Sequence, residues 1–94
     1  VNRMPPLALP LADKVVLVTG AARRVGAVIA AAFHARGARV AVHYRSSRAE
    51  AEALVERLEG LRPGSARAFA ADLGDIGACA ELPAAVVRAF GRLD

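Results

Sequence analysis

The stretch from Lys14 to Gly26, with the sequence KVVLVTGAARRVG, constrains the fold of this chain more than any other. Lys14 is followed by four consecutive aliphatic residues, which are typical of a parallel strand covered on both faces. Thr19, Gly20 and two alanines then allow a sharp turn, and from about Arg24 the apolar residues follow helical spacing. A strand that enters a helix through such a turn directs bare backbone N–H groups at one point. The helix dipole makes that point attractive to anions, most often phosphate.

The next 40 or so residues continue this alternation of strand and helix, a spacing typical of βα units. The first helix is predicted over residues 24–36, because Gly37 suits the position that follows a helix C-terminus. Its expected inward face consists of Val25, Val28, Ile29, Ala32 and Phe33. A second strand is predicted over residues 39–43, followed by Ser47 and Glu50 at the spacing of a capping box.

The helix that this box begins is predicted to end at Gly60 or at the Pro63-Gly64 pair. Its expected buried residues are Ala51, Leu54, Val55 and Leu58. A weaker third strand is predicted over residues 66–71, and a third helix over residues 76–90 before Gly91. Pro83 would either kink this last helix or mark a late start. Its expected inward residues are Leu82, Val86, Ala89 and Phe90.

The order βαβαβα predicts an α/β fold in which parallel strands are joined by right-handed helical crossovers. This is the N-terminal portion of a Rossmann-type doubly wound parallel sheet, in strand order 3-2-1. Residues 1–13 read as a proline-rich leader and residues 14–94 as the dinucleotide-binding part. In the complete fold another strand lies beside strand one, so we expect either a continuation of the chain or a second chain to complete the sheet. A self-sufficient small domain is the alternative.

Composition and charge restrict the setting of this domain. Hydrophobic residues make up 55% of the chain, but no apolar run approaches the roughly 20 residues of a membrane-spanning helix. The single cysteine, Cys79, cannot form an internal disulfide, so we expect a reducing, cytoplasmic setting and a core position for this residue. Residues 1–48 hold eight Lys or Arg and one acid, whereas residues 49–94 hold five Arg and eight acids. Positive charge therefore gathers in the half with the phosphate turn, although a basic surface without a role would look the same.

The motif Thr19-Gly20-x-x-x-Arg24-x-Gly26 predicts a dinucleotide site, because it follows a strand and opens a helix within a βαβ unit. Gly20 allows the tight turn, and Gly26 allows the helix to pack near the sheet. A structural turn without a ligand is the alternative. The two histidines are not spaced as metal ligands: His34 is expected at the surface, and His43 at a strand end or beside the ribose.

The segment after the second strand, HYRSSR, contains no acid. An NAD site usually carries a carboxylate there, which would repel a 2′-phosphate, whereas arginines and hydroxyls bind one. The segment therefore favours NADP(H) over NAD(H), with Arg45 and Arg24 available even if Ser47 only caps its helix. After the third strand, Asp72 could accept a hydrogen bond from an adenine amino group with Leu73 beside the ring, or it could cap the third helix.

The series VTGAARRVG, HYRSS, ADL and AFGRLD resembles the short-chain dehydrogenase/reductase superfamily over residues 14–94. The usual turn of that superfamily is TGxxxGxG, and Arg24 stands in place of its middle glycine. This replacement, together with HYRSS, is similar to the pteridine reductases, which depend on NADPH.

The resemblance implies three groups of contacts with NADP(H). The residues along its phosphates and ribose would be Gly20, Arg24, Val25 and Gly26. Those around the adenosine 2′-phosphate would be His43, Tyr44, Arg45, Ser46 and Ser47, and those at the adenine Asp72 and Leu73. The side chain of Arg23 would often point to solvent in this family.

Members of the family place their catalytic Tyr-x-x-x-Lys pair further along the chain. Here Tyr44 is the only tyrosine and Lys14 the only lysine, so no catalytic residue is assigned and this stretch alone is not expected to transfer hydride. The resemblance implies hydride transfer from NADPH to a carbonyl or imine, with a pterin or dihydrofolate as the candidate substrate. The substrate would be bound by residues past Asp94, in a homo-oligomer such as a tetramer. The alternative is a non-catalytic NADP(H)-binding or regulatory module. Nucleic-acid binding is disfavoured, because apart from Tyr44 no aromatic residue accompanies the arginines.

Overall fold

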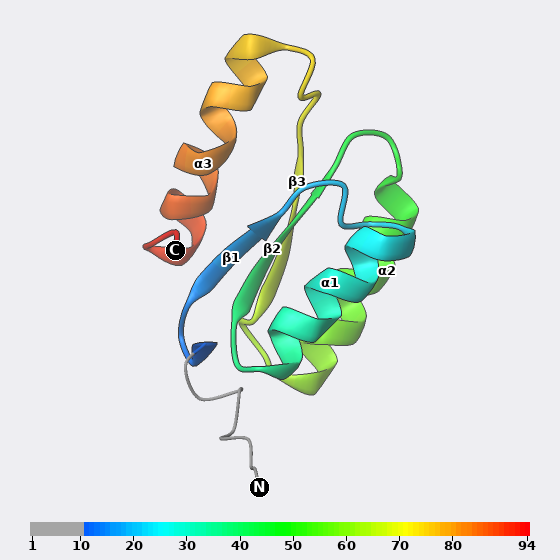
Figure 1. Ribbon diagram of the computed structural model, residues 1–94, viewed down its shortest axis with the longest axis vertical. Coiled ribbons are helices and arrows are strands. Elements are labelled where there is room, and N and C mark those ends of the chain that lie inside the picture. Colours follow the sequence, from blue (N-terminus) through cyan, green and yellow to red (C-terminus); the bar gives the residue numbers. More distant parts are fainter. Residues whose placement is uncertain (1–10) are drawn as a thin grey trace, which may run out of the picture.

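The computed structural model describes residues 11–94, and its elements follow the predicted order (Figure 1). The strands are β1 (Val15–Val18), β2 (Arg39–Tyr44) and β3 (Ala66–Ala70). The helices are α1 (Arg24–Ala35), α2 (Arg48–Leu61) and α3 (Ile76–Phe90). The predicted element boundaries are confirmed to within a residue. Most of the expected leader, residues 1–13, lies outside the described residues.

The three strands form one parallel sheet in the order β1-β2-β3, which confirms the predicted α/β fold and its 3-2-1 order. Val16 lies opposite Val40 on β2, and Val42 lies opposite Ala68 on β3. With β2 in the centre, all three carboxyl ends of the strands meet at one edge of the sheet.

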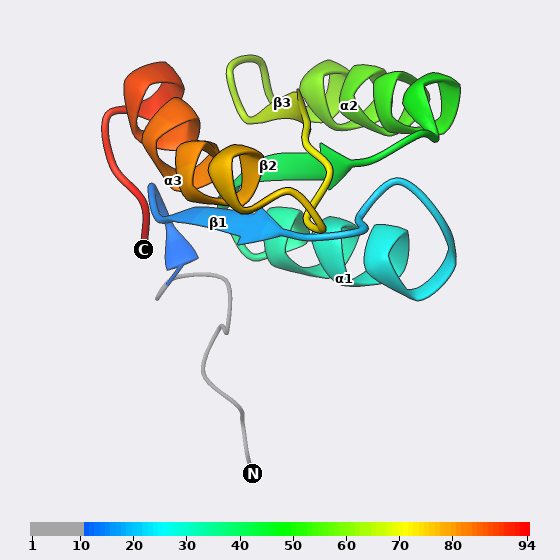
Figure 2. The ribbon, with the colours of Figure 1, turned by 90° about the horizontal axis from the view of Figure 1, so that it is seen from above.

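Helices cover both faces of this sheet, α1 and α2 on one side and α3 on the other (Figures 1 and 2). The larger core cluster lies under α1 and α2 and includes Val40, Val42, Leu54 and Leu58. The smaller cluster lies under α3 and joins Val15 and Ala41 to residues of that helix. The predicted inward faces of α2 and α3 are confirmed, since Leu54, Leu58, Leu82 and Val86 are all buried.

The predicted inward face of α1 is wrong at most positions: Phe33 packs against the core as predicted, but Ala32 is exposed. Val25 and Val28 are 70% and 68% exposed, and Ile29 is also exposed. The buried positions are Ala30 and His34, with Ala27 and Phe33 packed beside them. The face of α1 that packs on the sheet is thus shifted from the predicted one and carries Ala27, Ala30, Phe33 and His34.

His34 is therefore buried and not at the surface as predicted, with 2% of its surface exposed. Its Nε2 lies 2.7 Å from the hydroxyl of Ser65, which is also buried. The Ser65 hydroxyl donates to the Leu58 carbonyl, so its oxygen accepts from Nε2–H of the imidazole. This pair joins the last turn of α1 to the start of β3, because a buried polar ring needs a partner.

Two other expectations about helix ends are also corrected. Ser47 lies at the N-cap of α2 as predicted, but its side chain makes no capping hydrogen bond, and Glu50 instead lies 3.7 Å from the guanidinium of Arg23. Asp75, not Asp72, caps α3 by accepting from the amides of Gly77 and Ala78.

The third helix begins at Ile76 and continues through Pro83 to Phe90, so the proline does not mark a late start. Gly91 ends the helix in the left-handed conformation, with φ of 89°. Cys79 is exposed, which contradicts the expected core position.

One edge of β1 pairs with β2, and its other edge meets the last residues of the chain. The amide of Asp94 donates to the Val15 carbonyl, and the Val15 amide donates to the Asp94 carboxylate. Hydrogen bonds from Arg92 and from the Val15 amide lower the pKa of the Asp94 carboxyl group to about 2. Within residues 11–94 no helix is long and apolar enough to cross a bilayer.

Candidate functional site

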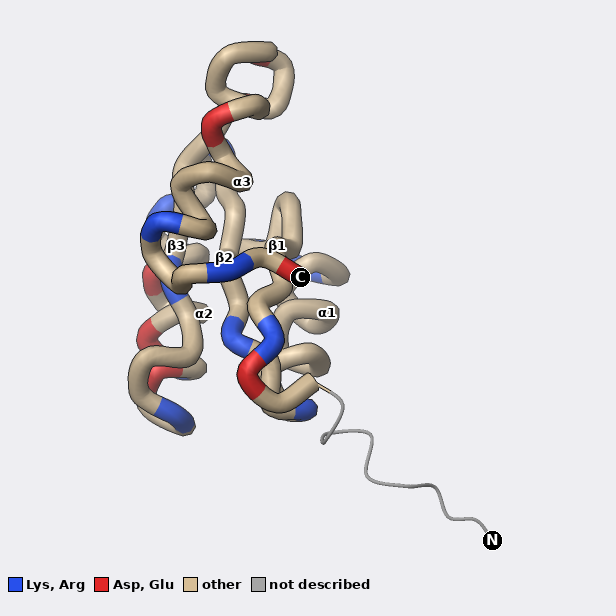
Figure 3. The backbone as a smooth tube through the Cα atoms, turned by 90° about the vertical axis from the view of Figure 1, so that its left-hand side faces the viewer, with Lys and Arg blue, Asp and Glu red and all other residues tan. Residues whose placement is uncertain are grey.

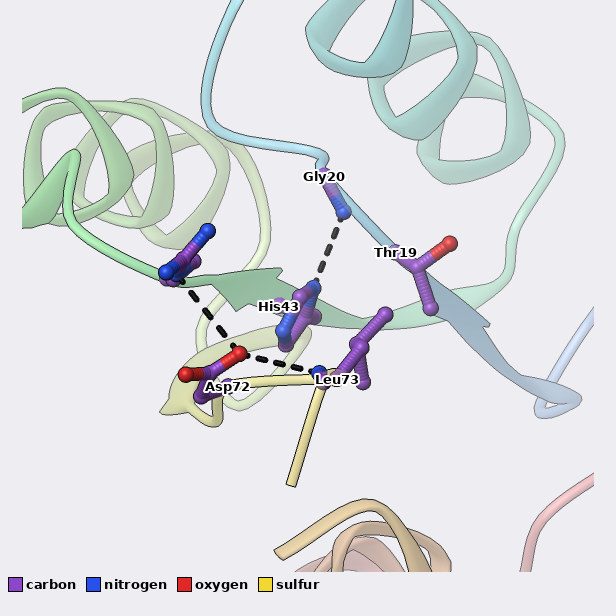
Figure 4. Close-up of a pocket in the computed structure, with 7 residues that line it drawn as sticks. Thr19, Gly20, His43, Asp72 and Leu73 are labelled. Atoms are coloured by element: carbon purple, nitrogen blue, oxygen red, sulfur yellow. Dashed lines mark hydrogen bonds and ion pairs between the residues drawn. The ribbon is translucent and has the colours of Figure 1, made fainter. Parts of the chain in front are cut away.

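The carboxyl ends of the three strands open onto a cavity of about 330 Å³ (Figure 4). Each strand contributes residues just beyond its last buried side chain. The lining comprises Thr19, Gly20, His43, Arg45, Asp72, Leu73 and Gly74. Residues far apart in the sequence meet here because parallel strands place all their carboxyl ends at one edge.

A second hollow of about 200 Å³ adjoins the first and shares Gly20 and Arg45 with it. Its lining comprises Gly20, Ala22, Arg23, Tyr44, Arg45, Ser46 and Ser47. The second hollow contains two arginines, three hydroxyl-bearing residues and no carboxylate, whereas the first contains Asp72 and the apolar side chain of Leu73. The two hollows therefore differ in the charge that they favour.

Arg45 and Asp72 interact across the first cavity, with Nε 3.6 Å from Oδ1 (Figure 4). The same carboxylate oxygen accepts from the Gly74 amide at 2.9 Å and so shapes the turn after β3. Both side chains are more than half exposed, so this ion pair is weak and either group can exchange its partner for a ligand.

The ring of His43 lies beneath the cavity, with only 3% of its surface exposed. The amide of Gly20 donates to Nδ1 at 2.9 Å (Figure 4), and Nε2 lies 2.8 Å from the carbonyl oxygen of Ala71. The backbone carbonyl of His43 also accepts from the Ala21 amide. His43 thus bonds to the turn after β1 and to the end of β3.

The turn after β1 is tightly packed around Gly20, which has a φ of 62°. A Cβ on Gly26 would overlap the Gly20 carbonyl oxygen and lie 3.0 Å from the Cα of Ala21. Gly26 therefore allows the first turn of α1 to approach the strand, as the motif predicts. The amides of Gly20 and Ala21 already have acceptors, so the unbonded amides of this turn are those at the start of α1.

Arg24 begins α1 with a φ of 53°, in the left-handed region that glycine adopts without strain. The superfamily's usual turn has its middle glycine at this position, and the backbone here keeps the conformation that glycine would favour. The substitution to arginine therefore adds a cation at the cost of backbone strain.

Eight of the eleven residues predicted to bind the cofactor line the two hollows. The other three, Arg24, Val25 and Gly26, lie at the N-terminus of α1 and line neither. Sequence reasoning omitted Thr19, Ala22 and Gly74, and left Arg23 doubtful; all four line a hollow. These four residues lie next to or near predicted residues in the sequence, and this proximity was the signal that could have identified them. Among residues 11–94 no group of three potential metal ligands is present.

Comparison with known proteins matches residues 14–94 to the family described as short chain dehydrogenase. Over 84 residues the chain is 50% identical to versicolorin reductase 1 of Aspergillus parasiticus, covering 89% of this chain and 32% of that protein. It is 48% identical over 62 residues to pteridine reductase 1 of Leishmania tarentolae, covering 66% of this chain and 22% of the relative. D-Threitol dehydrogenase of Mycolicibacterium smegmatis is 44% identical over 84 residues, covering 89% of this chain and 32% of that enzyme. The chain thus spans about a third or less of the length of these relatives.

Proposed function

The chain belongs to the short-chain dehydrogenase family, and from that premise we propose that it is the NADPH-binding part of a reductase. Residues 14–94 are its N-terminal dinucleotide-binding part, and further polypeptide supplies the remaining strands, the substrate site and the catalytic residues. Bound NADPH supplies a hydride for reduction of a carbonyl or imine. The names of relatives that reduce versicolorin and pteridines support a ring substrate, and a pterin or dihydrofolate is our candidate.

The second hollow suits the adenosine 2′-phosphate. Arg45, Ser46 and Ser47 line it, and no carboxylate is present to repel the phosphate. Ser47 makes no capping bond in α2, so its hydroxyl is available for a ligand. Charge-assisted bonds from a guanidinium are among the strongest that a phosphate can form. A lining with two arginines, hydroxyls and no carboxylate is the single observation that carries the choice of NADPH.

The first hollow suits the adenine ring. Leu73 offers an apolar contact, and Asp72 can accept from the exocyclic amino group once Arg45 turns to the phosphate. The pyrophosphate belongs at the start of α1, where the amides of Arg24, Val25 and Gly26 have no partner within the helix. Eight of the eleven predicted cofactor residues thus divide among three parts of one ligand.

Arg45→Glu in the full-length protein tests this assignment. The change removes the cation and places a carboxylate in the second hollow, so NADPH affinity should fall by about 10- to 100-fold, in line with the roughly 1.5–3 kcal/mol of a charged hydrogen bond. NADH affinity should change by less than about threefold, because NADH has no phosphate there. Titration of each nucleotide by isothermal calorimetry measures both.

Arg48→Glu is the matched control. It makes the same charge change three residues away, but Arg48 lines neither hollow and bonds to Glu52 on the surface of α2. The 2′-phosphate assignment would be refuted if Arg45→Glu weakened NADPH and NADH binding by the same factor. It would also be refuted if Arg45→Glu and Arg48→Glu weakened NADPH binding equally.

A further inference from the structure

His43 differs from the other residues of the site because its ring is buried and both of its nitrogens are already bonded. The ring is 3% exposed, so little of it faces the cavity that it lines. One nitrogen holds the turn after β1 (Figure 4) and the other holds the end of β3. A hydrogen bond from the ring to the cofactor would require one of these bonds to break.

The partners of the ring determine its protonation. Nδ1 accepts from the Gly20 amide, so Nδ1 carries a lone pair and no proton. The single proton of the neutral ring then lies on Nε2, which donates to the Ala71 carbonyl. The bond to Gly20 therefore requires the tautomer that carries its proton on Nε2.

The two bonds connect both parts of the proposed cofactor site. Gly20 is held between His43 and the first turn of α1, where Gly26 packs on its carbonyl oxygen. Ala71 immediately precedes Asp72 and Leu73, which line the first hollow. The His43 side chain therefore bonds both to the turn that precedes the pyrophosphate amides and to the segment that leads into the adenine contacts.

We propose that His43 is a positioning residue, which sets the affinity for NADPH through the Gly20 turn without touching the nucleotide. This inference rests on the proposed cofactor site. The bond to Gly20 matters more than the bond to Ala71, because Ala71 is also held by its own amide, which donates to the Tyr44 carbonyl. Gly20, with a positive φ, depends on external contacts to keep its conformation.

Two amide substitutions separate the two bonds. In His43→Asn the side-chain oxygen occupies the place of Nδ1 and can still accept from Gly20, whereas the bond to Ala71 is lost. In His43→Gln the amide nitrogen reaches the place of Nε2 and can still donate to Ala71, whereas Gly20 loses its acceptor. His34→Asn is the matched control, since it changes the other buried histidine, which bonds to Ser65 beside the start of β3.

The experiment measures NADPH dissociation constants and the hydrogen-exchange rate of the Gly20 amide in the full-length protein. We expect His43→Asn to bind within about threefold of wild type, and His43→Gln to bind at least about tenfold more weakly, with Gly20 exchange accelerated by a similar factor. His34→Asn should lower the melting temperature and leave the dissociation constant unchanged.

Equal affinities for the Asn and Gln variants would overturn the proposal, because a general packing role or a direct contact would not distinguish them. Unchanged Gly20 exchange in His43→Gln would also overturn it. Exchange needs no ligand, so if the wild type bound neither NADPH nor NADH, the proposed function would fail while the exchange pattern still decided the role of His43.

Discussion

His34 shows how one buried side chain links pH to stability in this fold. Burial and the nearby positive charge of Arg62 lower the pKa of His34, and Glu59 opposes this shift. Arg62 lies close because its guanidinium donates to the carbonyls of His34 and Ala38 at the end of α1. The neutral ring can donate to Ser65, but a second proton on it would lie in a buried place beside a cation.

We therefore expect the free energy of unfolding to fall as the pH is lowered through about 6.5, the ordinary pKa of histidine. The unfolded chain takes up a proton there that the folded chain resists, so acid favours unfolding until the lower pKa of the folded state is reached. Urea unfolding at pH 7.5 and pH 5.5 measures the difference. His34→Gln keeps a donor at the Nε2 position but does not titrate, so its stability should vary less over this range. An identical pH dependence in both proteins would contradict the linkage.

Among the elements, α1 is the helix whose position the site depends on most. Its first turn lies against the β1 turn at Gly26, and its first residue, Arg24, is left-handed. Its N-cap, Arg23, makes no capping hydrogen bond, whereas Asp75 caps α3 with its side chain. The start of α1 therefore relies on close packing and is left open to an anion.

Two substitutions in this first turn should change stability in opposite directions. Gly26→Ala drives a Cβ into the Gly20 carbonyl, so it should lower the free energy of unfolding by about 1–3 kcal/mol despite the better helix propensity of alanine. Arg24→Gly relieves the positive φ and should raise it by about 0.5–1 kcal/mol after the entropy cost of glycine. Urea denaturation of both variants measures the sign of each change in the free energy of unfolding. Stabilisation by alanine at Gly26 would show that the helix is not packed so closely.

Among the described residues, acidic side chains are concentrated on α2, and an exposed aliphatic stripe lies on α1. Acidic positions recur along α2 on its side away from α1 (Figure 3), where Glu52 and Glu56 are exposed. On α1, in contrast, Val25, Val28 and Ile29 form an exposed aliphatic stripe. Burying one such side chain is worth roughly 1.5–3 kcal/mol, so this stripe favours association with another surface.

We expect the polypeptide of residues 1–94, purified by itself, to self-associate through this stripe. Val28→Lys should shift it toward monomer, because a charge there opposes burial of the apolar face. Leu61→Lys is the matched control, since Leu61 is similarly exposed, at 73%, but lies at the end of α2. Sedimentation velocity at several concentrations compares the three proteins. A monomeric wild type, or equal effects of both variants, would contradict association through α1.

Local patterns were enough to predict the six elements, their order and the strand edge that carries the site. Aliphatic runs, glycines after helices and the TG-to-G spacing act over a few residues, so they can be read without knowing what packs against them. They also predicted His43, Arg45 and Asp72 at one place, because parallel strands align their ends. Contacts between distant segments could not be read in this way. Only packing in three dimensions determined that α1 turns its alanines inward and that His34 is buried against Ser65. The same holds for the bonds of His43 to Gly20 and Ala71. These features depend on distances between residues roughly 20 to 30 positions apart in the sequence.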